Sequence, residues 1–169
     1  MAFEVKVSHV DETLDRGEDA EQAATRLARA KASAIGKEES RPVLAADTLV
    51  VCDGRILGKP SSPKDAAEML RLLSGRDHEV VTAVCVLSAG VLRSGVARTT
   101  VTFADLSEAA IEWYVATEEP LDKAGAYHVD GRGALFITGI SGSPSNVAGL
   151  PVRTMLALAR EAEIDLGLA

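Results

Sequence analysis

Apolar and polar residues follow one another along this chain with two periods, one typical of strands and one typical of helices. An apolar run at 43–51 is rich in Val and Leu and is followed by an Asp53-Gly54 turn. Such a run predicts a strand buried on both faces of an α/β sheet. Further strands are predicted at 3–7, 78–87, 91–103 and 134–140. The Ser-Ala-Gly turn at 88–90 predicts that its two flanking strands pair antiparallel.

Apolar residues at helical spacing predict helices at 19–35, from Ser62 to Gly75, from Ser107 to just before Pro120, and from Pro151 onward. Ser62 and Ser107 suit the N-cap, and Pro63 suits the first turn of its helix. The segment 141–146 is rich in Ser, Gly and Pro and predicts a loop. Since no repeat or linker interrupts this mixed order, we expect 1–169 to form a single α/β domain, with helices flanking a mixed, twisted sheet.

Lys31 lies within the apolar stripe of the first predicted helix, four residues after Leu27. The helical period therefore turns Lys31 inward. Two interpretations remain open. Its stem could pack on the core while its ammonium reaches water, or its ammonium could point into a functional pocket.

The composition of the chain argues against several classes of partner. Of the 169 residues, 47% are hydrophobic and only 4% aromatic, so the core is expected to be aliphatic with few rings for stacking on bases. A net charge of −7 argues against nucleic acid as a partner, because that binding needs a basic surface. The two isolated cysteines suggest a reducing compartment, and no apolar run reaches the length of a membrane span. We therefore expect a cytoplasmic protein without a membrane partner.

Asp47 is the most informative candidate residue, because a carboxylate inside an apolar strand needs a partner. Motifs for nucleotide-binding glycine loops, zinc sites and serine nucleophiles are absent. What remains is a set of acids and lysines near the ends of predicted elements: Glu12, Lys31, Asp47, Lys59, Asp122 and Lys123. Carboxylates with lysines suit metal-assisted phosphoryl chemistry. Taken alone, Glu12 or the Asp122-Lys123 pair could equally be ordinary surface charges, whereas Asp47 favours function.

Seven short blocks occur in a fixed order: DET at 11–13, LARAKA at 27–32, ADT at 46–48, GKP at 58–60, LSGR at 73–76, EPLDKAGAY at 119–127, and SNV with GLP between 145 and 151. Together they resemble the ordered signature blocks of Maf proteins, from near Phe3 to the last helix. The resemblance implies a Maf-like, ITPase-like fold and a nucleoside triphosphate pyrophosphatase. Such an enzyme releases a nucleoside monophosphate and pyrophosphate, uses Mg²⁺ or Mn²⁺, and clears unwanted nucleotides. It also implies a homodimer.

The resemblance implies roles for individual residues. Asp47 matches the proton acceptor, and Glu12, Lys31 and Lys59 match other active-site positions; Asp47 and Glu12 are the expected metal ligands. Asp122 and Lys123 fall in the block that resembles the substrate-facing loop. Thr48 matches a position tied to nucleotide choice.

Two departures from the family pattern stand out. The first strand, a Ser-x-Ser-Pro-Arg-Arg phosphate loop and the first helix have no counterpart in 1–169, which leaves fewer donors for the phosphates. Asp130 stands where the branch acting on thymidine and uridine triphosphates carries Gln, so the preferred base stays open. The missing loop favours one alternative, a nucleotide-binding regulator of cell division or septum formation with little turnover. An unrelated phosphohydrolase is a third interpretation.

Overall fold

The computed structural model describes residues 3–167, which form one α/β domain around a five-stranded sheet with strand order β2-β1-β3-β4-β5. Its long strands are β1 (Val43–Cys52), β3 (Asp77–Ser88) and β4 (Val91–Phe103); the short ones are β2 (Arg55–Leu57) and β5 (Ile137–Ser141). The helices are α1 (Ala20–Gly36), α2 (Pro63–Leu73), α3 (Glu108–Val115), α4 (Pro144–Val147) and α5 (Val152–Glu161). Short 3-10 helices lie at η1 (Glu119–Asp122), η2 (Ala124–Ala126) and η3 (Arg132–Phe136). No helix among these residues is long and apolar enough to cross a membrane.

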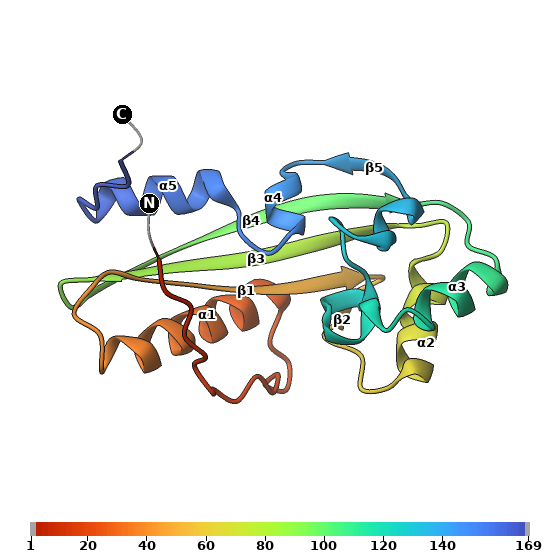
Figure 1. Ribbon diagram of the computed structural model, residues 1–169, viewed down its shortest axis with the longest axis horizontal. Coiled ribbons are helices and arrows are strands. Elements are labelled where there is room, and N and C mark those ends of the chain that lie inside the picture. Colours follow the sequence, from red (N-terminus) through yellow and green to blue (C-terminus); the bar gives the residue numbers. More distant parts are fainter. Residues whose placement is uncertain (1–2, 168–169) are drawn as a thin grey trace.

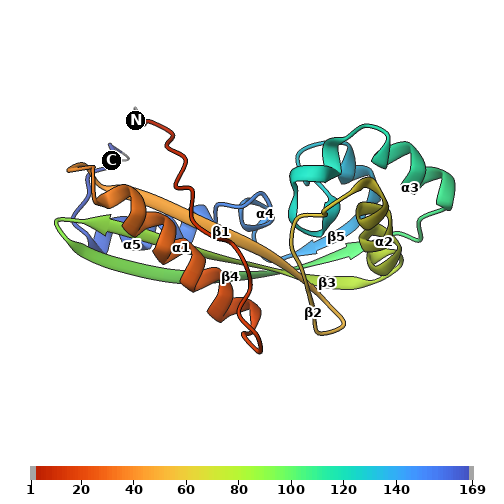
Figure 2. The same ribbon diagram turned by 90° about the horizontal axis from the view of Figure 1, so that it is seen from below.

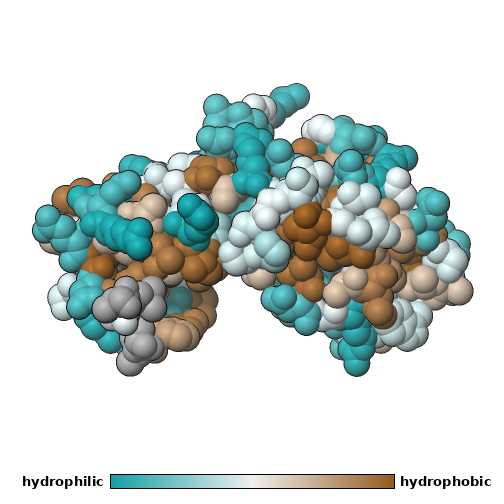
Figure 3. All heavy atoms as spheres, turned by 90° about the horizontal axis from the view of Figure 1, so that it is seen from above, coloured by the Kyte–Doolittle hydropathy of each residue, from teal (hydrophilic) through white to brown (hydrophobic). Residues whose placement is uncertain are grey.

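Two helices cover opposite faces of the sheet, and the side-chain alternation of β3 shows why. Ala83 and Cys85 pack in the cluster that contains the alanines of α1, whereas Val84 and Val86 pack against Leu158 of α5. Successive residues of a strand point to opposite faces, so β3 is buried on both. Figures 1 and 2 show α1 and α5 on either side of the long strands, with α2, α3 and the 3-10 helices gathered at the other end. Seen from above, the molecule has two lobes joined in the middle, and apolar patches lie on both lobes (Figure 3).

Most predicted elements are confirmed. Asp19 caps α1 through a capping box with Gln22, and Ser62 and Ser107 cap α2 and α3 by accepting from backbone N–H groups. The antiparallel pair β3–β4 has the predicted turn, with Ser88 opposite Val91. The local capping and turn chemistry of this chain therefore agrees with its tertiary structure.

The predicted mixed sheet is wrong in one respect, because all four strand pairs among residues 3–167 are antiparallel. The chain leaves β1 at one end of the sheet, forms β2 and α2 at that same end, and enters β3 from there (Figure 1). β3 therefore runs back along β1. The predicted burial of β1 on both faces also fails near its start, where Leu44 is 44% exposed.

Three further predictions need correction. Residues 3–7 form no strand, and Phe3, Val5 and Val7 are 72–81% exposed, because no strand within residues 3–167 pairs with this segment. The strand expected at 134–140 begins only at Ile137, since 3-10 helix η3 takes up its first residues. The predicted loop at 141–146 contains α4, which starts at Pro144, where a proline suits the first helical turn.

Candidate functional site

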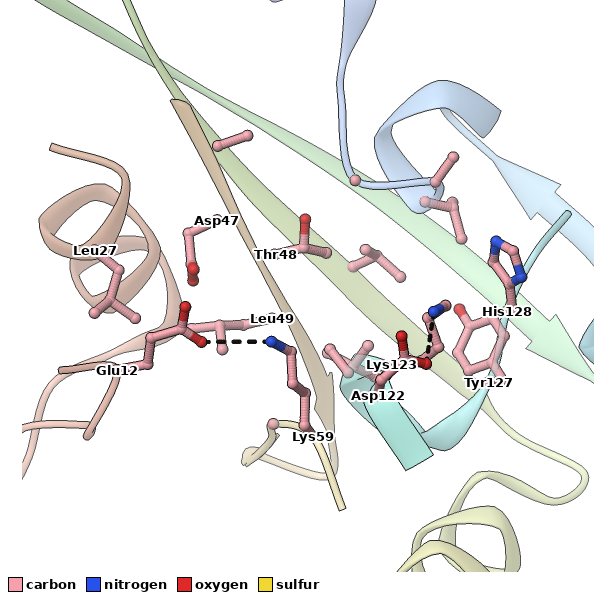
Figure 4. A pocket seen from close by; sticks show the side chains of 18 of the residues that line it. Glu12, Leu27, Asp47, Thr48, Leu49, Lys59, Asp122, Lys123, Tyr127 and His128 are labelled. Atoms are coloured by element: carbon pink, nitrogen blue, oxygen red, sulfur yellow. Dashed lines mark hydrogen bonds and ion pairs between the residues drawn. The ribbon is translucent and has the colours of Figure 1, made fainter. Parts of the chain in front are cut away.

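A pocket of about 500 Å³ lies along β1, between α1 and the 3-10 helices η1 and η2 (Figure 4). Consecutive residues of β1, from Ala46 to Val50, line it. Since neighbours along a strand point to opposite faces, the pocket follows the edge of β1 rather than one face of the sheet. Among the described residues, β2 pairs with β1 only at 50–52, which leaves this stretch of the edge accessible.

Asp47 has the partner that its buried position requires. Asp47 is 7% exposed, and its Oδ1 accepts a 2.6 Å hydrogen bond from Nζ of Lys31. The same ammonium lies 2.6 Å from Oε1 of Glu12. Lys31 reaches both because helix α1 packs across β1 with this lysine on its inner stripe. Of the two interpretations of Lys31, the structure therefore matches the one in which its ammonium points into a pocket.

The pKa values in this cluster follow from burial and from the shared ammonium. Burial raises the pKa of Asp47, and the Lys31 ammonium opposes that rise without cancelling it. The hydrogen bond from Lys31 lowers the pKa of the more exposed Glu12. Burial alone would lower the pKa of Lys31, but its bonds to both carboxylates raise it. The pKa values of the two carboxyls are thus shifted in opposite directions, and it is at Asp47 that burial favours the protonated form.

Two more lysines face the pocket. Lys59, just beyond β2, lies 3.7 Å from Oε2 of Glu12 (Figure 4). Lys123 donates a 2.6 Å hydrogen bond to its neighbour Asp122, and both line the pocket beside η1. The Gly125 N–H bonds to the Gly58 carbonyl at 3.0 Å, which ties these two loops together. The structure therefore places six of the eight predicted site residues, all of them charged, in the lining of one pocket.

Thr48 is the seventh, and it belongs to a different part of the pocket wall. Its side chain points away from the Asp47 carboxylate (Figure 4), and its Oγ1 lies 3.0 Å from Oγ1 of Thr82. Thr82 in turn donates to the backbone carbonyl of Asn146 in α4. This chain of bonds holds the start of segment 147–149, which lines the pocket, close to β1.

Asp130 is the exception. It is exposed and does not line the pocket, although His128 and Val129 do. It lies in the turn where Gly131 N–H bonds back to the His128 carbonyl, and this turn carries it away from the wall. A base-reading role for Asp130 stays a prediction.

Sequence reasoning missed Tyr127 and His128, which line the end of the pocket opposite Glu12 and Asp47 (Figure 4). Tyr127 is 5% exposed, and its hydroxyl lies 2.9 Å from Nε2 of the buried His78. The His128 N–H donates to the hydroxyl of Tyr114, which itself donates to Glu119. These residues follow 3-10 helices, where no strand or helix period marks an inward position. In the sequence, only the motif block at 119–127, which ends at Tyr127, pointed to this part of the chain.

The donor set limits how a metal could bind. No group of three or more His, Cys, Asp or Glu side chains within residues 3–167 is arranged to hold a metal ion. Asp47 and Glu12 supply two carboxylates around one point, which Lys31 occupies. One or two carboxylates are what Mg²⁺ uses when phosphate oxygens complete its coordination. The residues therefore fit a metal ion that is coordinated partly by these carboxylates and partly by phosphate oxygens of a substrate.

Comparison with known proteins agrees with this geometry. The family model described as Maf-like protein matches residues 1–162. The chain belongs to the Maf family. A dTTP/UTP pyrophosphatase of Anaeromyxobacter sp. (strain Fw109-5) is 48% identical over 167 residues, covering 96% of this chain and 80% of the relative. One from Moorella thermoacetica is 52% identical over 156 residues, covering 90% and 80%. One from Bacillus mycoides (strain KBAB4) is 44% identical over 167 residues, covering 98% and 87%.

Proposed function

We propose that this Maf protein hydrolyses a nucleoside triphosphate to a nucleoside monophosphate and pyrophosphate. One observation carries the proposal: a buried carboxylate, Asp47, whose pKa is raised, shares a pocket with Lys31, Lys59 and Lys123. Lysines provide point charges for phosphates, and a carboxylate of raised pKa suits proton transfer from water. The names of the relatives support dTTP and UTP as the first substrates to test.

In this proposal Asp47 accepts a proton from the water that attacks the α-phosphorus. A new P–O bond forms there while the bond to the oxygen that bridges to the β-phosphorus breaks, and pyrophosphate leaves with that electron pair. The side chains of Lys59 and Lys123, which are 60% and 31% exposed, line the pocket and would bind phosphate oxygens. Before the nucleotide binds, Lys31 holds the Asp47 carboxylate in place through its 2.6 Å hydrogen bond.

A divalent cation, Mg²⁺ or Mn²⁺, fits beside Glu12 and Asp47, and when bound it would neutralise charge on the phosphates. We extend the proposal to a cytoplasmic enzyme that acts as a homodimer and limits unwanted nucleotides. These three properties are expected of the family rather than visible in the residues of the pocket.

The test measures pyrophosphate release from a panel of dTTP, UTP, dCTP, dGTP and ATP with Mg²⁺ or Mn²⁺. Asp47→Asn keeps the size of the side chain but removes the base, and we expect it to lower kcat by about 100-fold or more, the usual contribution of a general base. Asp53→Asn is the matched control, because Asp53 is exposed, outside the pocket and at φ 49°, which Asn tolerates. Release of inorganic phosphate instead would indicate another hydrolase. Tight nucleotide binding without product would indicate a regulator.

A further inference from the structure

The six charged side chains that line the pocket balance one another. The acids are Glu12, Asp47 and Asp122, and the bases are Lys31, Lys59 and Lys123. Their formal charges at neutral pH sum to zero. A free divalent cation is attracted to carboxylates chiefly by their uncompensated charge, and the pocket lining carries no net negative charge that would draw one in.

Lys31 also occupies the place that such a cation would need. Its Nζ lies 2.6 Å from one oxygen of Asp47 and 2.6 Å from one oxygen of Glu12. Its side chain is only 18% exposed, which limits screening of these pairs by water. A metal that used the same two oxygens would have to displace the ammonium, and the displaced charge would then need a new partner nearby.

We propose that Lys31 is a built-in counter-ion that keeps the Glu12–Asp47 pair from binding a divalent metal until the phosphates of a nucleotide arrive. The phosphates supply both missing elements, because their oxygens complete the coordination of the metal and their negative charge gives Lys31 a new partner. Metal and nucleotide therefore enter together as one complex. This inference rests on the proposed function for the identity of the ligand.

The test measures Mn²⁺ binding to the nucleotide-free protein by electron paramagnetic resonance of free Mn²⁺. In Lys31→Met we expect the Kd at this pair to be at least about tenfold tighter than in the wild type, because loss of a unit charge a few ångströms from a divalent ion exceeds that factor even near a protein surface. Lys64→Met is the matched control, since Lys64 is 87% exposed and, within the described part of the chain, pairs only with Glu68 at 3.8 Å. The gained site should disappear in Lys31→Met with Asp47→Asn.

A second arm uses the wild type alone and so does not depend on any variant folding. Water-proton relaxation reports Mn²⁺ held on the protein, and we expect enhancement only after an α,β-methylene triphosphate analogue is added. Equal Mn²⁺ affinity in wild type and Lys31→Met, or binding to the nucleotide-free wild type as tight as in the presence of the analogue, would overturn the inference. Failure of the proposed function has a different signature, which is the absence of pyrophosphate release while both metal-binding results hold.

Discussion

Protonation of the buried His78 ring should destabilise this fold in mild acid. His78 is 3% exposed and packs edge-on against Phe103 and Tyr127, with ring centroids 4.9 and 5.3 Å away. Its Nε2 lies 2.9 Å from the Tyr127 hydroxyl, and its Nδ1 has no hydrogen-bond partner among the described residues. An imidazolium carries two N–H groups, so one of them would be buried without an acceptor. Burial accordingly lowers the pKa of His78 to about 4, and nearby Asp77 offsets only part of this.

Whether acid stabilises or destabilises the fold depends on which state, folded or unfolded, binds the proton at a given pH. An unfolded histidine binds it below about pH 6.5, whereas folded His78 binds it only near pH 4. Between these values the unfolded state holds more protons, so the free energy of unfolding falls as the pH falls. The loss is complete below pH 4 and absent above pH 7. At 1.36 kcal/mol per pH unit, this window corresponds to about 3 kcal/mol.

The assay is urea unfolding followed by circular dichroism at pH 7.5, 6, 5 and 4, for the wild type and His78→Gln. Gln places an amide near the position of Nε2 and can bond the Tyr127 hydroxyl, but it does not titrate. Carboxylates contribute equally to both proteins, so the difference between their pH profiles isolates His78. We expect the wild type to lose about 3 kcal/mol more than the variant between pH 7.5 and 4. Parallel profiles would refute the reasoning.

Two further substitutions test how the pocket is built. Tyr114→Phe removes the hydroxyl that accepts the His128 N–H, and leaving that partly buried donor unpaired should lower the free energy of unfolding by about 1 kcal/mol and raise KM with little change in kcat; an unchanged denaturation midpoint would contradict this. Gly125→Ala places a Cβ 2.9 Å from a Val50 methyl at φ 69° and should lower stability by about 2–4 kcal/mol. Gly54→Ala is its control, because φ is 73° there and, among residues 3–167, no atom beyond its chain neighbours lies within 4 Å of the added Cβ, so equal losses would argue against the clash.

The sequence predicted the parts of the fold that local chemistry determines. The caps at Ser62 and Ser107 and the turn before Val91 act within a few residues, and all appear in the structure. The 3–7 segment shows the limit. Its alternation is that of a strand, but only its polar positions find partners, where Glu4 and Lys6 pair with Arg41 and Glu39. Periodicity describes a face that could be buried and does not supply the neighbouring strand.

The candidate site divides in the same way. Lys31 and Asp47 stand out because each breaks an apolar pattern of known period, so their inward direction follows from sequence alone. Tyr127 and His128 belong to irregular backbone, and their placement depends on contacts far along the chain, such as those with His78 and Tyr114. Asp130 lies only two residues beyond His128, yet the turn at Gly131 directs it to solvent.

The two halves of the pocket are held by different interactions, and this difference bears on how a nucleotide would be selected. Ion pairs hold the charged half, where Lys31 and Lys59 pair with Glu12. The phosphates of a nucleotide can replace Glu12 as the partner of these lysines, because phosphate and carboxylate oxygens both accept charge-assisted hydrogen bonds. Buried hydrogen bonds hold the half near Thr48: Asn146, which has no exposed surface, donates to the Val80 carbonyl at 3.0 Å and to Oγ1 of Thr99 at 3.0 Å. Breaking such bonds leaves buried groups unpaired, so this wall resists rearrangement. Discrimination between bases should therefore reside in the fixed half, and the rearrangement that accompanies catalysis in the half where Lys31 changes partners.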